Sequence, residues 1–385
     1  MSEVVETPTL LKSPLNDKHR ELGARMIEYE GWLLPGSYGD ESSEYATVRE
    51  GGAGLIDFSS RGRFLVTGSE AVQFLNGLIT NDMKTLVENR WMPAAFPNVQ
   101  GRLIASVRIV RASDAKIDTN VSPAFFVDTE AVTHERVLKT VERFTLAGDF
   151  RVTDITNRTA HLTLQGKRAA DVIQAVLGEE ASSLAMNGAG RTPWHDGEVT
   201  VIRASYTGED GFDLIVNSEH VGSLWDSLRN AGARPVGHDA LETLRIEAGI
   251  PRYGIDMDET NVVTEAALDE AVSYTKGCYV GQEIIARIKY RGHVAKKLSG
   301  LVFNQRVEIE AGANIRSLDE KDIGRITSAT YSPRLSQTIA LAYLKYDYLA
   351  AGTEVKVRGG SDEVMASVAA LPFVNSKPAS EQIGA

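Results

Sequence analysis

The residue with the most reactive side chain in this sequence is Cys278, the only cysteine among 385 residues. It lies in an octapeptide that reads Lys276, Gly277, Cys278, Tyr279, Val280, Gly281, Gln282 and Glu283. Residues 276–297 carry six Lys or Arg and one acid, whereas residues 255–271 carry six acids and no Lys or Arg. Nearby cations stabilise a thiolate over a thiol. We therefore predict an accessible, reactive thiol at Cys278, favoured by Lys276, in place of the buried apolar role that free cysteines commonly have.

A single cysteine also limits the metal chemistry of this chain. It excludes an intrachain disulfide and any zinc or iron–sulfur site built from several cysteines of one chain. The seven histidines are scattered, with no pair at positions i and i+4, which argues against a metal site made by this protein alone. Walker, HExxH, CxxC and GxSxG motifs are missing from the sequence. We predict no resident metal.

Two acids around a predicted hairpin form the second candidate site. Glu209 lies within the segment Tyr206-Thr207-Gly208-Glu209-Asp210-Gly211, and Asp213 follows it. A carboxylate accepts two parallel hydrogen bonds, which suits the amino and ring N–H edge of a pterin or a purine. Both acids could equally be solvated turn residues, and this alternative stays open.

Arg245 is a third candidate, on a predicted helix over residues 239–248. It lies beside the apolar face formed by Leu241, Leu244 and Ala248. A partly buried arginine needs an anionic partner. The partner is either a structural acid such as Glu242 or the carboxylate of a ligand, and the sequence does not separate the two.

Composition narrows the classes of function. The length predicts two or three domains, and 43% hydrophobic with 24% charged residues is ordinary for a globular protein. A net charge of −11 argues against general nucleic-acid binding. No apolar run approaches the ~20 residues needed to span a bilayer, and residues 1–15 do not resemble a signal peptide. We expect a cytoplasmic protein without nucleic-acid or membrane partners.

Hydrophobic periodicity predicts the elements that position these residues. Residues 63–67, 103–110, 124–127, 199–205 and 212–216 read as strands, and helices are expected around 72–78, 137–144, 221–228 and 239–248. After residue 297, five short strand-like runs separated by Gly, Pro and Asp predict a small all-β barrel or sandwich. The expected division is a flexible terminus (1–15), a core of two intertwined α+β subdomains (16–295), a C-terminal β-barrel domain (296–374) and a disordered tail (375–385).

Three segments together resemble the aminomethyltransferase family, the glycine-cleavage T-protein fold. They are Gly-Leu-Ile-Asp-Phe-Ser at 54–59, Tyr-Thr-Gly-Glu-Asp-Gly-Phe at 206–212 and Leu-Arg-Ile-Glu-Ala-Gly at 244–249. The octapeptide at 276–283 resembles the signature of the YgfZ-type branch, folate-binding proteins that support iron–sulfur enzymes. The resemblance implies an α+β fold with antiparallel sheets and flanking helices in a ring, a C-terminal β-barrel and tetrahydrofolate in a central channel.

The resemblance also implies roles for individual residues. It places Glu209 on the pterin and Arg245 near the same ligand, with Tyr206, Asp213 and Glu247 as further contacts. Gly277, Tyr279, Gly281, Gln282 and Glu283 complete the loop around Cys278, in which Gln282 and Glu283 would orient the backbone. Cys278 would lie near the channel mouth, where it would ligate a cluster iron or form a mixed disulfide with a client.

One departure separates the branches of the family. True aminomethyltransferases carry an acidic pair that includes a catalytic aspartate, and the comparable positions here are Ala105 and Ser106. General acid–base help is worth ~10²–10⁴-fold in rate, so its loss argues against a classical aminomethyltransferase. We expect a tetrahydrofolate-binding accessory protein for iron–sulfur cluster assembly or repair, with client enzymes or cluster-assembly proteins as partners. The alternative is a folate-dependent aminomethyl or methyl transferase acting on a small amine.

Overall fold

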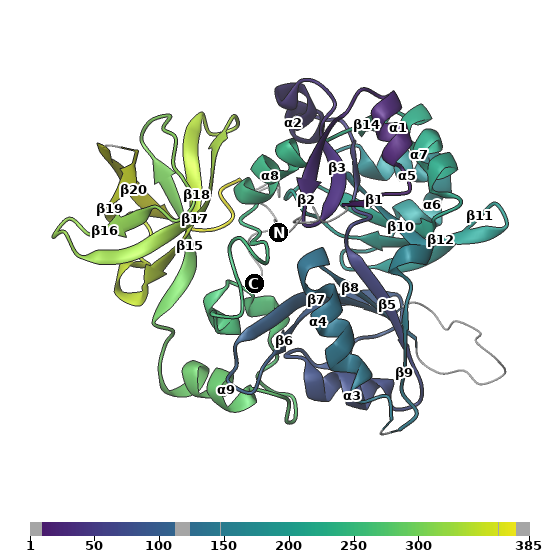
Figure 1. Cartoon of the computed structure of the whole chain (residues 1–385), viewed down its shortest axis with the longest axis horizontal. Coiled ribbons are helices and arrows are strands. Elements are labelled where there is room, and N and C mark those ends of the chain that lie inside the picture. Colours follow the sequence, from purple (N-terminus) through teal and green to yellow (C-terminus); the bar gives the residue numbers. More distant parts are fainter. Residues whose placement is uncertain (1–9, 112–123, 147, 361, 375–385) are drawn as a thin grey trace, which may run out of the picture.

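The computed structural model describes residues 10–111, 124–146, 148–360 and 362–374. Three units surround a common centre: a six-stranded sheet, a five-stranded sheet and a closed barrel (Figure 1). Helix α8 (His238–Glu247) lies between them, and its packing contacts include strand β17 of the barrel. The prediction of an α+β fold with sheets and flanking helices in a ring and a C-terminal β-barrel is confirmed.

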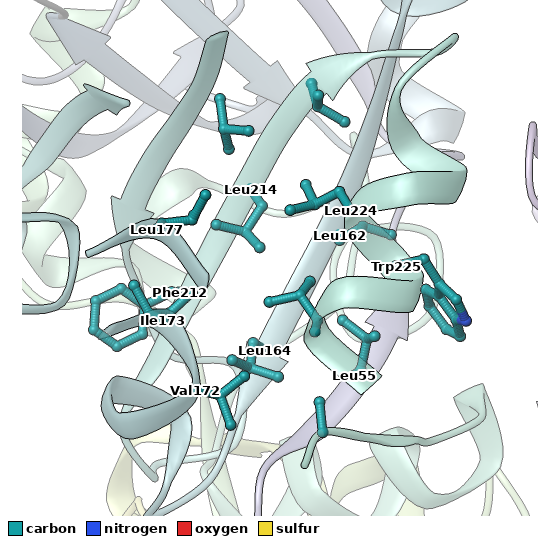
Figure 2. Close-up of a cluster of buried hydrophobic side chains, with 14 of the residues drawn as sticks. Leu55, Leu162, Leu164, Val172, Ile173, Leu177, Phe212, Leu214, Leu224 and Trp225 are labelled. Carbon is teal, nitrogen blue, oxygen red and sulfur yellow. The ribbon is translucent and has the colours of Figure 1, made fainter. Parts of the chain in front are cut away.

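The six-stranded sheet carries the largest hydrophobic core. Its strands in spatial order are β11 (Ala189–Trp194), β12 (Gly197–Arg203), β13 (Gly211–Asn217), β10 (Thr159–Gln165), β4 (Gly54–Asp57) and β14 (Arg234–Pro235). Helices α5 (Ala169–Leu177), α6 (Glu179–Ser182) and α7 (Val221–Asn230) contribute to this unit. Figure 2 shows side chains of α5 and α7 beside those of the strands. Leu162 of β10, Leu214 of β13 and Trp225 of α7 are all fully buried.

The predicted hairpin at residues 199–216 lies within this sheet. Strands β12 and β13 pair antiparallel, with Arg203 opposite Phe212, and the Tyr206–Asp210 segment forms the loop between them. The local sequence explains this result, because apolar residues alternate along β12, β13 is an almost continuous apolar run, and Gly208 and Gly211 stand on either side of the loop acids. The prediction of two strands here is confirmed.

The five-stranded sheet forms the second unit. Its strands in spatial order are β6 (Arg90–Pro97), β7 (Leu103–Arg111), β8 (Phe125–Thr129), β5 (Gly62–Thr67) and β9 (Arg151–Asp154). Helices α3 (Ala71–Leu78) and α4 (Ala131–Glu142) supply apolar side chains to its core. Phe144, which the periodicity placed on the apolar face of α4, lies beyond the helix end and is 36% exposed.

The barrel and two smaller groups of elements complete the fold. The barrel strands are β15 (Lys296–Phe303), β18 (Gln337–Lys345), β17 (Asp322–Ser332), β16 (Asn314–Arg316), β19 (Glu354–Gly359) and β20 (Asp362–Ala369). A three-stranded sheet joins β1 (Leu11–Lys12), β3 (Trp32–Ser37) and β2 (Arg25–Tyr29). The remaining helices are α1 (Asn16–Glu21), α2 (Glu41–Arg49) and α9 (Gln282–Arg291).

The first residues that the structure describes correct one prediction. Residues 10–15 belong to the fold and are not a loose terminus. Strand β1 pairs with β3, Ser13 donates a hydrogen bond to the buried Asp57, and Leu15 is 2% exposed. Non-local burial explains the difference, because the polar, proline-containing sequence gives no local sign of it. The other predicted loose segments, residues 1–9 and the tail 375–385, lie outside the described residues. Within the described residues, no helix combines the length and apolarity required to cross a bilayer.

Candidate ligand-binding site

A cavity opens at the centre of the ring, where loops of the two sheet units meet α8. It contains about 660 Å³ of empty space, part of it open to solvent. The residues that line it, the central cavity from here on, are Tyr29, Glu30, Phe58, Ser60, Arg61, Glu130, Tyr206, His238, Leu241, Glu242, Arg245, Ile250, Pro251 and Arg252.

Aromatic rings form one part of the wall. The ring centroids of Tyr29 and His238 are 4.4 Å apart, and those of Phe58 and Tyr206 are 4.8 Å apart. Burial lowers the pKa of His238 to about 4, so this imidazole is neutral at physiological pH. Neutral rings around an open space suit a flat heteroaromatic ligand, since aromatic groups attract each other in stacked and edge-to-face arrangements.

Charged side chains form the rest of the wall. Nη1 of Arg252 donates to a carboxylate oxygen of Glu242 at 3.1 Å and to the hydroxyl of Tyr29 at 3.1 Å. Arg61 holds the buried Asp128 through two hydrogen bonds of 2.8 and 2.9 Å. Burial raises the pKa of Glu30, and it raises the pKa of Glu130 to about 7. The cavity therefore offers guanidinium donors and, in Glu130, a carboxylate that exchanges protons near neutral pH.

Of the five residues that the resemblance assigned to the folate, Tyr206 and Arg245 line this cavity. Arg245 is also a structural residue. It pairs with Asp256 at 2.5 Å and with Glu242, and it donates to Ser328 of β17 at 2.6 Å. The structure thus supplies the structural acid that the sequence left as one of two options, and the guanidinium links α8 to the barrel.

Glu209 and Glu247 belong to a different, buried cluster. Nη1 of Arg49 is 3.0 Å from Oε1 of Glu209, and Nη2 is 2.7 Å from Oε2 of Glu247. Tyr45 and Ser332 also donate to Glu247, at 2.7 and 2.5 Å. Neither acid is among the residues that line the cavity. Their assignment as folate contacts stays a prediction, and these contacts give both carboxylates a structural role.

Asp213 lies beside Tyr206 rather than on the cavity wall. It accepts hydrogen bonds from Nη1 of Arg108 at 2.5 Å and from the Tyr206 hydroxyl at 3.2 Å. Burial opposes ionisation here, but Arg108 and then His161 outweigh it and lower the pKa of Asp213 to about 2. Asp213 is therefore a permanent anion that holds Tyr206 in place at the cavity wall.

The octapeptide 276–283 forms a loop and the first turn of α9. The amide of Val280 donates to the carbonyl of Gly77 at 3.0 Å. Gly281 has φ +76°, and a Cβ there would lie 2.3 Å from the carbonyl oxygen of Asn98. Only glycine fits both the conformation and the space. Tyr279 is buried against the core, whereas the Glu283 side chain is 83% exposed and pairs with Arg287 at 2.9 Å.

Lys276 points away from solvent and towards the end of α3. Its Nζ donates to the carbonyl oxygens of Asn76, Ile79 and Asn81 at 2.7, 3.0 and 2.6 Å. These three carbonyls match the three donors of an ammonium group. The contacts assign Lys276 to the structure of the loop, while its predicted influence on the thiol stays a prediction.

Replacing Lys276 with methionine is expected to lower the free energy of unfolding by about 2–4 kcal/mol, because three carbonyls at a helix end lose their charged donor. Urea denaturation followed by circular dichroism measures the change. Lys297→Met is the control, since the Lys297 ammonium contacts the exposed carboxylate of Asp269 at the surface. A loss for Lys276→Met no larger than for the control would refute this role.

Cys278 is exposed, as the sequence predicted. It is not among the residues that line the central cavity, so a position at the channel mouth remains a prediction. Within the described ranges, no group of three or more His, Cys, Asp or Glu is arranged to hold a metal ion.

Ala105 is fully buried in strand β7, and Ser106 faces the same side of that strand as Arg108, two residues further.

Several residues of the cavity were missed by the sequence interpretation, namely Tyr29, Glu30, Phe58, Arg61, Glu130, His238 and Arg252. Most lie in turns or at the ends of elements, where periodicity carries no information. A weak signal existed for Arg252, which follows Gly249 by three residues in Ile-Pro-Arg. Glu30 adopts a positive φ of 52° at the tight turn between β2 and β3, which glycine commonly occupies.

Comparison with known proteins agrees with this architecture. The GCVT N-terminal domain family matches residues 15–276, and the glycine cleavage T-protein C-terminal barrel domain family matches residues 296–375. The chain is 34% identical over 370 residues to an aminomethyltransferase of Rubrobacter xylanophilus, covering 96% of this chain and 95% of that protein. It is 31% identical over 375 residues to an aminomethyltransferase of Halalkalibacterium halodurans, covering 94% and 98%.

A solved structure has the same fold. The glycine cleavage system aminomethyltransferase T from Bartonella henselae superposes with a TM-score of 0.86 at 25% identity, covering 96% of this chain and 99% of that chain. These matches confirm the predicted family, while the YgfZ-type branch stays a prediction. Both the domain matches and the identity over nearly the full length place this chain in the glycine-cleavage T-protein family, that of the aminomethyltransferases.

Proposed function

We propose that this protein binds tetrahydrofolate in the central cavity and transfers a one-carbon unit between the folate and a small amine. The observation that carries the proposal is the lining of the cavity, whose neutral rings and charged groups surround an open space at the centre of an aminomethyltransferase fold. The relatives named above are aminomethyltransferases, which favours this reading over an accessory role.

The chemistry of the wall suits the parts of a folate. A pterin is flat and would stack on Tyr29, Phe58 or Tyr206. Its amino and ring N–H groups are donors, and Glu30 and Glu130 offer acceptors. The carboxylates of the glutamate tail are anions, for which Arg252 at the cavity wall is the nearest suitable partner in this arrangement.

Turnover tests the enzymatic part of the proposal. Purified protein is incubated with tetrahydrofolate and with candidate amines that carry a methyl or aminomethyl group, and the folate products are separated by chromatography. Formation of methylene- or methyl-folate above a heat-inactivated control supports the proposal. Folate binding without any turnover would remove the transferase and leave a folate-binding protein.

A specific observation favours a second candidate function, assistance in iron–sulfur cluster assembly or repair. Cys278 is exposed in a loop whose eight residues resemble the YgfZ-type signature, and Ala105 and Ser106 supply no carboxylate on β7. A lone thiolate would have to share a cluster iron with a partner, since one ligand does not hold a cluster. Folate would then regulate or accompany that task.

The thiol can be tested without a client. Iodoacetamide at neutral pH is expected to alkylate native Cys278 completely, because the side chain is exposed, and mass spectrometry counts the adduct. Cys278→Ala is expected to leave tetrahydrofolate affinity unchanged but to reduce the activity of iron–sulfur client enzymes in cells grown under oxidative conditions. Unchanged client activity would contradict the second function and would not affect the first.

A further inference from the structure

The central cavity contains a carboxylate, that of Glu130, which does not cap the helix that it precedes. Glu130 follows strand β8 and is the residue immediately before α4. Acids in this position commonly cap the helix with their side chain, but the Glu130 side chain makes no such hydrogen bond. Its Oε2 instead accepts from the backbone amide of Tyr253 at 2.8 Å.

This contact turns the carboxylate into the cavity. Glu130 lines the space together with Arg61, Glu30 and Arg252. Among the described residues, no hydrogen-bond donor contacts its other oxygen, Oε1, and no guanidinium lies within ion-pair distance of it. One oxygen therefore fixes the orientation of the group, and among the described residues the other has no hydrogen-bond partner at the cavity wall.

We propose that Glu130 is the proton-exchanging carboxylate of this cavity and serves the one-carbon transfer proposed above, on which this inference rests. It would take the place of the acidic pair that Ala105 and Ser106 do not supply. Ala105 is fully buried in the core and is not available to a ligand.

The proposed step balances without an additional reagent. A folate amine nitrogen bonds to the one-carbon group of the donor amine and loses its proton to the Glu130 carboxylate. The bond between that carbon and the donor nitrogen breaks, and its electron pair leaves with the amine. The carboxylic acid of Glu130 then returns the proton to the departing amine, so that Glu130 ends as it began.

The surroundings of Glu130 tune it for this exchange. Burial raises the pKa of Glu130 to about 7, the Arg61 guanidinium opposes the shift, and Glu30 adds to it; the amide of Tyr253 and Arg252 favour the anion. Tyr29 also faces it across the cavity. A carboxyl group with this pKa is protonated in about half of the molecules at pH 7. It can thus act both as acid and as base at neutral pH.

Proton release on binding tests the inference. Tetrahydrofolate is titrated into the protein at pH 7 by calorimetry in two buffers with different heats of ionisation, which gives the number of protons exchanged. The wild type is expected to release about half a proton, because donor N–H groups of the ligand favour the ionised form. Glu130→Gln keeps the acceptor for Tyr253 and is expected to bind about five- to tenfold more weakly than wild type, without the release, because the ligand's donors favour the ionised carboxylate that Gln cannot form.

Two further variants make the result specific. Glu135→Gln, on the same helix with an 80% exposed side chain, should behave as wild type. Glu30→Gln should still release the proton on binding. If Glu30→Gln abolished the release while Glu130→Gln kept it, the assignment of the exchanging group to Glu130 would be overturned. Where turnover is measurable, Glu130→Gln should lower kcat by about 10²–10⁴-fold, a much larger change than the rise in KM for folate. Binding of folate with equal proton release by wild type and Glu130→Gln would overturn the inference alone; no binding at all would overturn the proposed function as well.

Discussion

Replacing Arg49 with methionine is expected to lower the free energy of unfolding by about 3–5 kcal/mol. The Arg49 side chain is 3% exposed and contacts Glu209 and Glu247, whose side chains are 7% and 0% exposed. Removing one partner of a buried ion pair leaves uncompensated charge in a medium of low dielectric constant, and costs of this size are typical. Urea denaturation followed by fluorescence gives the difference.

Two further variants identify the cause of this loss. Arg168→Met removes an exposed ion pair with Asp171, at 3.4 Å, and should change stability by less than about 1 kcal/mol. Adding Glu247→Gln to Arg49→Met should restore part of the stability, because it removes one of the two carboxylate charges that the guanidinium had neutralised. If Arg49→Met is as stable as Arg168→Met, the cluster is not the structural element described here.

The second large effect concerns ligand binding. Ile250 lines the central cavity and is half-buried, so tryptophan at this position would extend into the space available to a ligand. We expect Ile250→Trp to weaken tetrahydrofolate binding at least about 100-fold, equivalent to about 2.7 kcal/mol. Equilibrium titration by calorimetry under anaerobic conditions measures the affinity.

The chain offers a matched control for this variant. Ile255 lies five residues further along, is 45% exposed and does not line the cavity. Ile255→Trp should bind tetrahydrofolate as the wild type does, and thermal unfolding of both variants checks that neither has lost its fold. Equal binding by Ile250→Trp and Ile255→Trp would place the folate elsewhere on the molecule.

Much of the fold could be predicted because its signals are local. The hairpin β12–β13 has apolar alternation on β12, an almost continuous apolar run on β13 and a glycine at each side of the loop acids, all within one short stretch of sequence. The barrel strands are separated by residues that favour turns. Residues 10–15 were predicted wrongly, because Leu15 and Ser13 are held by partners in the core that no local pattern indicates.

The site was predicted less well because its contacts are distant in the sequence. Glu209 suggested a ligand contact from its place in a turn, but it pairs with Arg49, 160 residues away. Charge near Cys278 suggested that Lys276 activates the thiol, whereas the ammonium contacts carbonyls about 200 residues earlier. Glu30, Glu130 and Arg252 come together only in the folded chain, and each looks like an ordinary surface residue in the sequence.

A calorimetric titration of the wild-type protein with tetrahydrofolate tests the central claim most directly. The structure predicts saturable binding of one molecule per chain, with an affinity that Cys278→Ala leaves unchanged and Ile250→Trp weakens at least about 100-fold. Absence of saturable binding to a folded wild-type protein, or binding that the cavity variant leaves intact, would contradict the assignment of the central cavity as a folate site.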